Sequence, residues 1–134
     1  MTEQELRHQI VQLARSLFMR GYSSGSAGNI SVRLDNGFLI TPTNSSFGLL
    51  EPEKLSLLDP EGRHRDGDKP SKEWAVHLAM YRRRPAAGSV VHLHSPYCMA
   101  VSCLDWIDAD NALPPLTPYF VMRIGRLPLL PYFR

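Results

Sequence analysis

Apolar residues recur every three or four positions along the start of the chain. This is the spacing at which side chains share one face of a helix. The positions concerned are Leu6, Ile10, Leu13 and Leu17. Thr2 followed by Glu5 forms a capping box before this stretch, and Gly21 supplies a stop after it. The pattern predicts an amphipathic helix that docks on a hydrophobic core.

Alternation of apolar and polar residues predicts strands further along the chain. Residues 30–34 alternate in this way, the Asp-Asn-Gly sequence at 35–37 is a strong hairpin signal, and residues 38–40 form the returning strand. Residues 89–94 predict another strand, which ends on two histidines. The expected local structure is therefore a hairpin and at least one later strand.

Two further helices are predicted from their start signals. Ser71 is the expected N-cap of a helix that runs to about Arg84, which places Glu73 in its first turn. Ser95 followed by Pro96 starts the other, since proline is well tolerated at the first helical position.

The remaining segments carry weaker signals. A short apolar element is expected at 53–58, a charged loop at 59–69 and a sheet segment at 127–130. The mixture of helices, hairpins and strands predicts an α/β fold of three layers, with helices flanking a mainly antiparallel central sheet.

Composition narrows the class of protein. The chain has 134 residues, 43% of them hydrophobic, which suits one globular domain over residues 1–134. A net charge of +2, with residues 82–84 as the only basic run, argues against nucleic-acid binding. No apolar run approaches the length of about 18 residues that a membrane span needs. We expect a soluble, cytoplasmic protein in which Cys98 and Cys103 are reduced and buried.

The histidine pair at the end of the predicted strand is a candidate metal site. Because strand side chains alternate, His92 and His94 should project from one face while Val91 and Leu93 face the core. Catalytic zinc usually has three protein ligands and an open position, so two histidines are one ligand short. Two hydrogen-bonded histidines beside a sheet edge are the alternative.

Other polar residues allow two interpretations each. Glu73 could simply favour the helix dipole, and the loop at 25–29 could be a plain turn rather than a phosphate-binding loop. His77 is expected to be a packed core histidine, and His8 and His64 are expected to be solvated. None of these histidines is a convincing third metal ligand.

Four motifs change this picture when they are taken in order. They are Ser26-Ala27-Gly28-Asn29-Ile30-Ser31, Ile40-Thr41-Pro42-Thr43, Pro70-Ser71-Lys72-Glu73 and Val90-Val91-His92-Leu93-His94. In this order and spacing they resemble the class II aldolase/adducin-head family. The resemblance runs from about Leu6 to the last residue.

The resemblance implies functions for individual residues. Glu73 is implied as the catalytic acid/base, and His92 and His94 as ligands of zinc or another divalent metal, which Glu73 could also ligate in the resting site. The residues implied in substrate or phosphate binding are Gly28, Asn29, Thr43, Asn44, Ser71 and Lys72. A phosphorylated sugar-acid substrate is implied too, as is a homotetramer with sites near subunit interfaces.

Two departures point to one branch of the family. Family aldolases usually have a glycine in the place of Asn44 and a second serine in the place of Lys72. These residues, with residues 95–104 and 113–119, resemble the 3-oxo-tetronate 4-phosphate decarboxylase branch. The expected reaction is zinc-dependent decarboxylation of that compound to dihydroxyacetone phosphate and CO2 in acid-sugar catabolism.

Three other functions stay open at this point. A sugar-phosphate aldolase similar to L-fuculose-phosphate aldolase and a 4-epimerase could both use the same scaffold. A non-catalytic interaction module like the adducin head is the third.

The family supplies a third metal-binding histidine from a His-Gly segment that is not among these 134 residues. We therefore expect a class II aldolase-like domain truncated at its C-terminal end. Such a chain should be poor in metal, poorly active and prone to self-association through an unpaired sheet edge.

Overall fold

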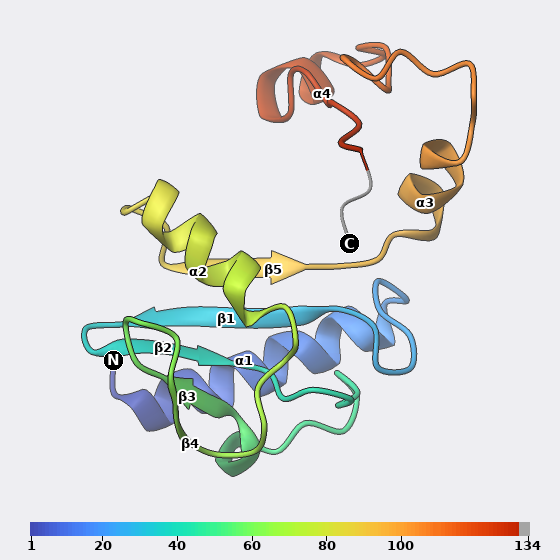
Figure 1. Cartoon of the computed structure of the whole chain (residues 1–134). Coiled ribbons are helices and arrows are strands. Elements are labelled where there is room, and N and C mark those ends of the chain that lie inside the picture. The colour runs from blue at the N-terminus through green and yellow to red at the C-terminus, as the bar shows by residue number, and fades with distance from the viewer. Residues whose placement is uncertain (132–134) are drawn as a thin grey trace. The chain divides into compact units, whose positions relative to one another are not determined.

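A computed structural model describes residues 1–131 of the chain (Figure 1). The chain divides into two compact units, Met1–His94 and Ser95–Arg134. Each unit is described by itself below. No helix among the described residues is long and apolar enough to cross a membrane.

The first unit is built on a five-stranded sheet with the order β4-β3-β2-β1-β5, in which all neighbours are antiparallel. The strands are β1 (Asn29–Leu34), β2 (Gly37–Ile40), β3 (Ser56–Leu58), β4 (His64–Asp66) and β5 (Ser89–His92). The predicted hairpin is confirmed. The strand predicted at 89–94 is confirmed as far as His92, where β5 ends, so His94 lies just beyond the strand. The prediction of a plain loop at 59–69 was wrong, because β4 lies inside it.

Helices cover both faces of this sheet. Helix α1 (Glu3–Met19) contributes Ile10 and Ala14 to one core cluster, which includes Ile30 of β1 and Leu39 of β2. Helix α2 (Trp74–Arg83) packs on the other face, against a cluster that includes Phe38 and Ile40. A short 3-10 helix, η1 (Pro52–Lys54), precedes β3. The predicted α/β fold, a mainly antiparallel sheet flanked by helices, is confirmed.

Helix α1 begins as the sequence predicts. The Thr2 side chain accepts a hydrogen bond from the Glu5 amide, and the Glu5 side chain accepts one from the Thr2 amide, which completes the capping box. The helix ends at Met19, and Gly21 then adopts a left-handed φ of 75°. A glycine takes this conformation without steric cost.

The predicted start of α2 was wrong. Ser71 is not its N-cap, since the N-cap position is Glu73, whose side chain makes no capping hydrogen bond. The Ser71 amide instead donates to the carbonyl oxygen of Thr41 at 3.2 Å. This bond ties the backbone to the end of β2 and delays the helix. The Glu73 carboxylate therefore lies outside the helix, where it can face β1 and β5.

The second unit contains α3 (Pro96–Ser102) and α4 (Pro118–Arg123). The predicted start of α3 is confirmed, because the Ser95 side chain accepts a hydrogen bond from the Cys98 amide. The sheet segment predicted at 127–130 was wrong. Its backbone bonds to residues 109 and 112 through Leu127 and Leu129, but Pro128 has no N–H to extend a ladder.

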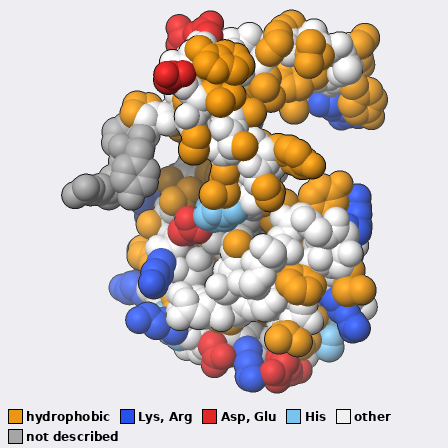
Figure 2. All heavy atoms as spheres, turned by 90° about the vertical axis from the view of Figure 1, so that its right-hand side faces the viewer, with side chains coloured by type: hydrophobic (Ala, Val, Ile, Leu, Met, Phe, Trp, Pro, Cys, Tyr) orange, Lys and Arg blue, Asp and Glu red, His pale blue; other side chains and the backbone are white. Residues whose placement is uncertain are grey.

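Much apolar surface of the second unit is exposed. Figure 2 shows orange side chains gathered on the surface. The large apolar residues that this unit exposes most are Tyr97, Leu116, Met122, Trp106 and Leu130. Cys98 and Cys103 are free and exposed, so the prediction of buried thiols was wrong. They belong to short, solvated segments rather than to a core.

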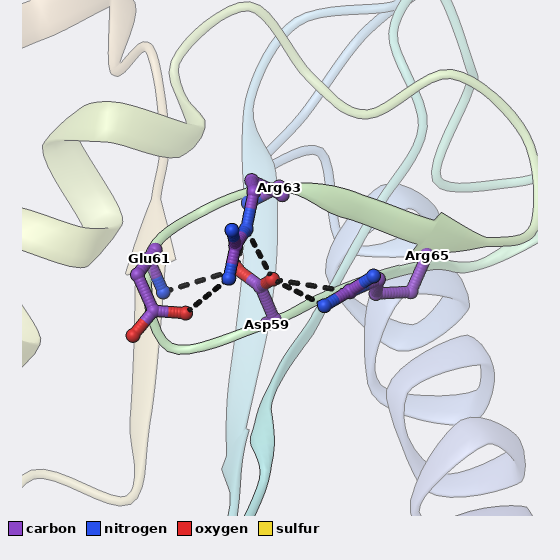
Figure 3. Close-up of polar contacts among 4 residues, drawn as sticks. All are labelled: Asp59, Glu61, Arg63 and Arg65. Carbon is purple, nitrogen blue, oxygen red and sulfur yellow. Dashed lines mark hydrogen bonds and ion pairs between the residues drawn. The ribbon is translucent and has the colours of Figure 1, made fainter.

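Asp59 closes the turn between β3 and β4 (Figure 3). Its Oδ1 accepts hydrogen bonds from the amides of Glu61 and Arg63, and its Oδ2 accepts from the guanidinium groups of Arg63 and Arg65 at 2.7 and 3.0 Å. Burial by itself raises the pKa of Asp59, but the Arg63 and Glu61 hydrogen bonds and the Arg63 charge lower it to about 2.

Replacing Asp59 with Asn keeps the size of the side chain but removes its charge. We expect the variant to melt a few degrees below the parent chain near neutral pH. The pKa of Asp59 is depressed from 3.8 to about 2 in the folded chain, so its stabilisation is present above pH 3.8 and is lost as pH falls through about 2. Thermal unfolding followed over this pH range should show the two melting temperatures converge. Glu61→Gln, at an exposed carboxylate, is the matched control, and a pH-independent gap would contradict the assignment.

Candidate metal and acid/base site

Three potential metal ligands converge in the first unit. Among the described residues, Glu73, His92 and His94 each place a ligand atom within 4.8 Å of the others. His92 Nδ1 lies 2.9 Å from Glu73 Oε2, and the two imidazole centroids are 4.8 Å apart. The sequence-based prediction that the two histidines share one side of the chain agrees with this geometry.

The other side of the same strand differs in part from the prediction. Leu93 packs against the core cluster of α1, as expected. Val91 is 53% exposed, so its predicted place in the core was wrong. Since β5 is the last strand of the sheet among the described residues, its face toward α1 is only partly covered.

Gly28 allows the loop before β1 to approach β5 closely. Its φ is 85°, and a Cβ at this position would lie 2.8 Å from the backbone oxygen of His92. Asn29, the next residue, pairs directly with His92 in the ladder between β1 and β5. The amide of its side chain donates to Glu73 Oε2 at 2.5 Å. Asn29 is thereby a neighbour of both the carboxylate and the histidine.

The surroundings of Glu73 favour its charged form. Partial burial raises the pKa of this carboxyl, but the hydrogen bond from Asn29 and the nearby His92 and His94 outweigh it and lower the pKa overall. Glu73 is therefore ionised at neutral pH. One carboxylate and two imidazole nitrogens are donors that zinc and similar divalent ions accept, so the residues present fit such an ion.

The residues expected to bind phosphate do not form one set. Thr43 and Asn44 line a hollow of about 520 Å³ that also includes Lys54 and Lys69. Among the others, Ser71 is buried and Lys72 is exposed, and neither lines this hollow. Gly28 and Asn29 lie beside His92 instead. A role in phosphate binding stays a prediction for all six.

Asn44 adopts a left-handed backbone conformation. Its φ is 57°, and no other non-glycine residue among those described has a positive φ. Asparagine tolerates this left-handed conformation better than most residues do. Asn44 can therefore hold this backbone conformation while its amide lines the hollow.

A buried polar network behind Glu73 was not predicted. His77 is fully buried, as expected of a core histidine, but it also bonds to Asn29 and Ser31. The signal for it was present in the sequence. Glu73 and His77 are four residues apart on a helical stripe, and Asn29 and Ser31 are two apart on a strand.

The fold agrees with the comparisons to known proteins. The chain belongs to the family of class II aldolase and adducin N-terminal domains, whose sequence profile matches residues 8–134. It is 54% identical over 135 residues to the 3-oxo-tetronate 4-phosphate decarboxylase of Haemophilus influenzae, covering 100% of this chain and 64% of that protein. It is 37% identical over 134 residues to the L-fuculose phosphate aldolase of Escherichia coli, covering 98% of this chain and 60% of that protein.

A solved structure supports the same placement. The crystal structure of YgbL from Escherichia coli matches with a TM-score of 0.91 at 49% identity, over 98% of this chain and 64% of that one. The chain thus spans less than two thirds of the length of these relatives.

Zinc should bind the chain weakly and one to one, because the three groups that converge include only two histidines. Replacing His92 with Ala should weaken binding by more than the loss of about 10–100-fold that outer-shell substitutions cause. Isothermal calorimetry of the apo chain measures this directly. The matched control is His8→Ala, at an exposed position of α1, which should change nothing. Equal zinc affinity in the two variants would show that the metal binds elsewhere.

Proposed function

We propose that this chain carries metal-binding and acid/base groups of a divalent-metal decarboxylase that converts 3-oxo-tetronate 4-phosphate into dihydroxyacetone phosphate and CO2. The observation that carries the proposal is the convergence of Glu73, His92 and His94 within 4.8 Å. Its specificity rests on the similarity to the Haemophilus influenzae decarboxylase along the whole of this chain. Zinc is the metal that the donor set suits best.

The chemistry requires a place for the electrons of the breaking bond. When the bond from the carboxylate to C2 breaks, CO2 leaves and its electron pair moves toward the C3 carbonyl, which gives an enediolate. His92 and His94 would hold a divalent ion, whose positive charge would favour this movement. A proton must then be added to C2, and Glu73 is the group placed to deliver it.

Glu73 needs to acquire that proton after the substrate binds. Its lowered pKa means that the resting carboxylate is ionised. Its side chain is 40% exposed, so a proton from solvent can reach it. A weakly held proton also transfers readily to carbon that carries negative charge. The groups around Glu73 therefore suit a donor that is reloaded in each cycle.

The phosphate end of the substrate is assigned to the hollow beside β2. The hollow is lined by Lys54 and Lys69, by Glu51, which pairs with Lys54 at 2.6 Å, and by Asp68. The two lysines would contact the phosphate oxygens, and the polar side chains of Thr43 and Asn44 would donate hydrogen bonds to them. Lys72 is exposed and is proposed to pair with the substrate carboxylate or phosphate. Gly28, Asn29 and Ser71 complete the proposed substrate-binding set.

Aldol cleavage is the second candidate, and the similarity to L-fuculose phosphate aldolase favours it specifically. Cleavage of a bond to an aldehyde would leave the same enediolate, so the same groups could serve. Assays of sugar phosphates with and without the carboxylate distinguish the two reactions, and they also test a 4-epimerase. A non-catalytic module would have no reason to keep a carboxylate and two histidines together.

The assembly is proposed to be a homo-oligomer, a tetramer by family resemblance, in the cytoplasm. The exposed apolar side chains of the second unit support association with further copies.

Replacing Glu73 with Gln should remove decarboxylation while phosphate-ligand binding is retained, because the amide keeps the shape but cannot carry the proton. We expect a rate loss of about 10²–10⁴-fold, which is typical when a general acid is removed. CO2 release measures turnover, and calorimetry with dihydroxyacetone phosphate measures binding.

Metal content of the Glu73→Gln variant separates two roles. Retained metal assigns the loss to proton transfer, and lost metal assigns it to ligation. Near-parental decarboxylation by this variant would make Glu73 a structural residue and sink the proposal.

A further inference from the structure

Polar side chains join β1 to α2 in a continuous row inside the first unit. On the strand they lie two residues apart and on the helix four apart, so that each set faces the other. The strand residues are Asn29 and Ser31, and the helix residues are His77 and Tyr81. Ser31 and His77 are both 0% exposed, and Asn29 and Tyr81 are each 3% exposed. Water therefore cannot complete their hydrogen bonds, and they must satisfy one another.

The contacts run in sequence toward the candidate site. The Tyr81 hydroxyl lies 2.7 Å from Ser31 Oγ, and Ser31 Oγ lies 2.7 Å from His77 Nδ1. His77 Nε2 bonds to Asn29 Oδ1. The Asn29 amide then donates to Glu73 Oε2. We call this row the relay. Within it, each side chain is hydrogen-bonded only to its immediate neighbours.

The donor and the acceptor of each hydrogen bond in the relay follow from the bond between Asn29 and Glu73. An ionised carboxylate only accepts, so the NH2 group of Asn29 must face Glu73 and its oxygen must face His77. His77 Nε2 must then carry the proton that is donated to this oxygen. A neutral imidazole has one N–H, so Nδ1 accepts from the Ser31 hydroxyl, and Ser31 Oγ is left to accept from Tyr81. All donors point toward Glu73.

We infer that His77 is a positioning residue of the site, which acts through Asn29 to hold the Glu73 carboxylate beside His92. The inference rests on the proposed function for its consequence in catalysis, but the hydrogen-bond direction follows from the contacts of the relay with the Glu73 carboxylate and does not depend on that function. If the Asn29 amide were turned over, its oxygen would face a carboxylate and its NH2 group would face a second donor. The carboxylate excludes that arrangement, because two acceptor oxygens would then face each other at the Asn29–Glu73 contact.

The surroundings of His77 keep it neutral. Burial, with a smaller contribution from His92, lowers the pKa of His77 to about 4. An uncharged ring retains the acceptor that Ser31 requires. At the Tyr81 end of the relay, the guanidinium of Arg33 lies over the Tyr81 ring at 4.5 Å from the centroid.

Two substitutions of His77 separate its role as hydrogen-bond donor to Asn29 from its role as acceptor for Ser31. In His77→Gln the amide nitrogen reaches the place of Nε2, so the donor to Asn29 is kept. In His77→Asn the shorter amide replaces only the Nδ1 side, so the acceptor for Ser31 is kept and the donor to Asn29 is lost. Both variants lose the imidazole ring and some packing. Each is therefore the control for the other, because a loss of thermal stability that comes from packing should appear in both.

The first measurement uses the unmodified 134-residue chain without metal. Nitrogen-15 NMR of labelled histidine reports which ring nitrogen carries the proton, and the His77 signal is assigned by its absence from His77→Gln. We expect protonated Nε2 and bare Nδ1 at neutral pH. The opposite tautomer, or a charged ring, would overturn the inference without any assay of activity.

The second measurement compares zinc affinity by calorimetry. We expect His77→Gln to stay close to the parent chain and His77→Asn to bind about 10–100-fold more weakly, the range seen when outer-shell partners of a metal site are lost. Equal losses in both variants would make His77 a packing residue only. If the chain carries decarboxylase activity, kcat should stay close to the parent value in His77→Gln and fall in His77→Asn, while KM stays similar in both.

These outcomes separate the inference from the proposed function. Absence of CO2 release, with the expected tautomer and the expected split in zinc affinity, contradicts the proposed reaction and leaves the relay established. If CO2 is released but His77→Gln and His77→Asn bind zinc with the same affinity, the reaction is supported and the positioning role of His77 is overturned.

Discussion

The requirement that buried polar groups find partners fixes how α2 lies on β1, and the candidate site depends on that contact. Ser31 and His77 are inaccessible to solvent, and leaving one such group unpaired costs about 1–3 kcal/mol. Apolar packing alone would tolerate sliding or rotation of the helix by a small amount. A row of hydrogen bonds does not, because a shift would break several of them at once. The helix register in turn sets where Glu73 lies relative to His92.

The two faces of the sheet consequently stabilise the fold in different ways. On the α1 face the core cluster is apolar and includes Ile30 and Leu39, and the buried Arg7 of α1 donates hydrogen bonds to the backbone oxygens of Pro52 and Leu55. On the α2 face apolar residues such as Phe38 surround the polar row. The first face supplies non-directional stability through burial of apolar area. The second supplies direction, since hydrogen bonds accept only a narrow range of geometry. A single β-strand serves both, because its side chains alternate.

Local signals made much of this fold predictable from the sequence. The capping box before α1 and the Asp-Asn-Gly turn act within a few residues, so their structures follow without tertiary information. Strand β4 escaped prediction because all three of its residues are exposed and polar. The start of α2 escaped because Ser71 bonds to Thr41, thirty residues earlier. The metal candidates were found by a strand pattern and a family resemblance. For the relay, the sequence spacing groups Asn29 with Ser31, but only the fold shows that these two meet His77 of α2.

The outer strands of the sheet have a consequence for how it can grow. Among the described residues, β4 on one side is exposed throughout and carries His64, Arg65 and Asp66. Charges on an outer strand disfavour pairing with another strand. On the opposite side, β5 carries no acidic or basic residue before His92, and Val91 stands open to solvent. The sheet is thus polarised: any strand added to it, from whatever source, has its place next to the two histidines.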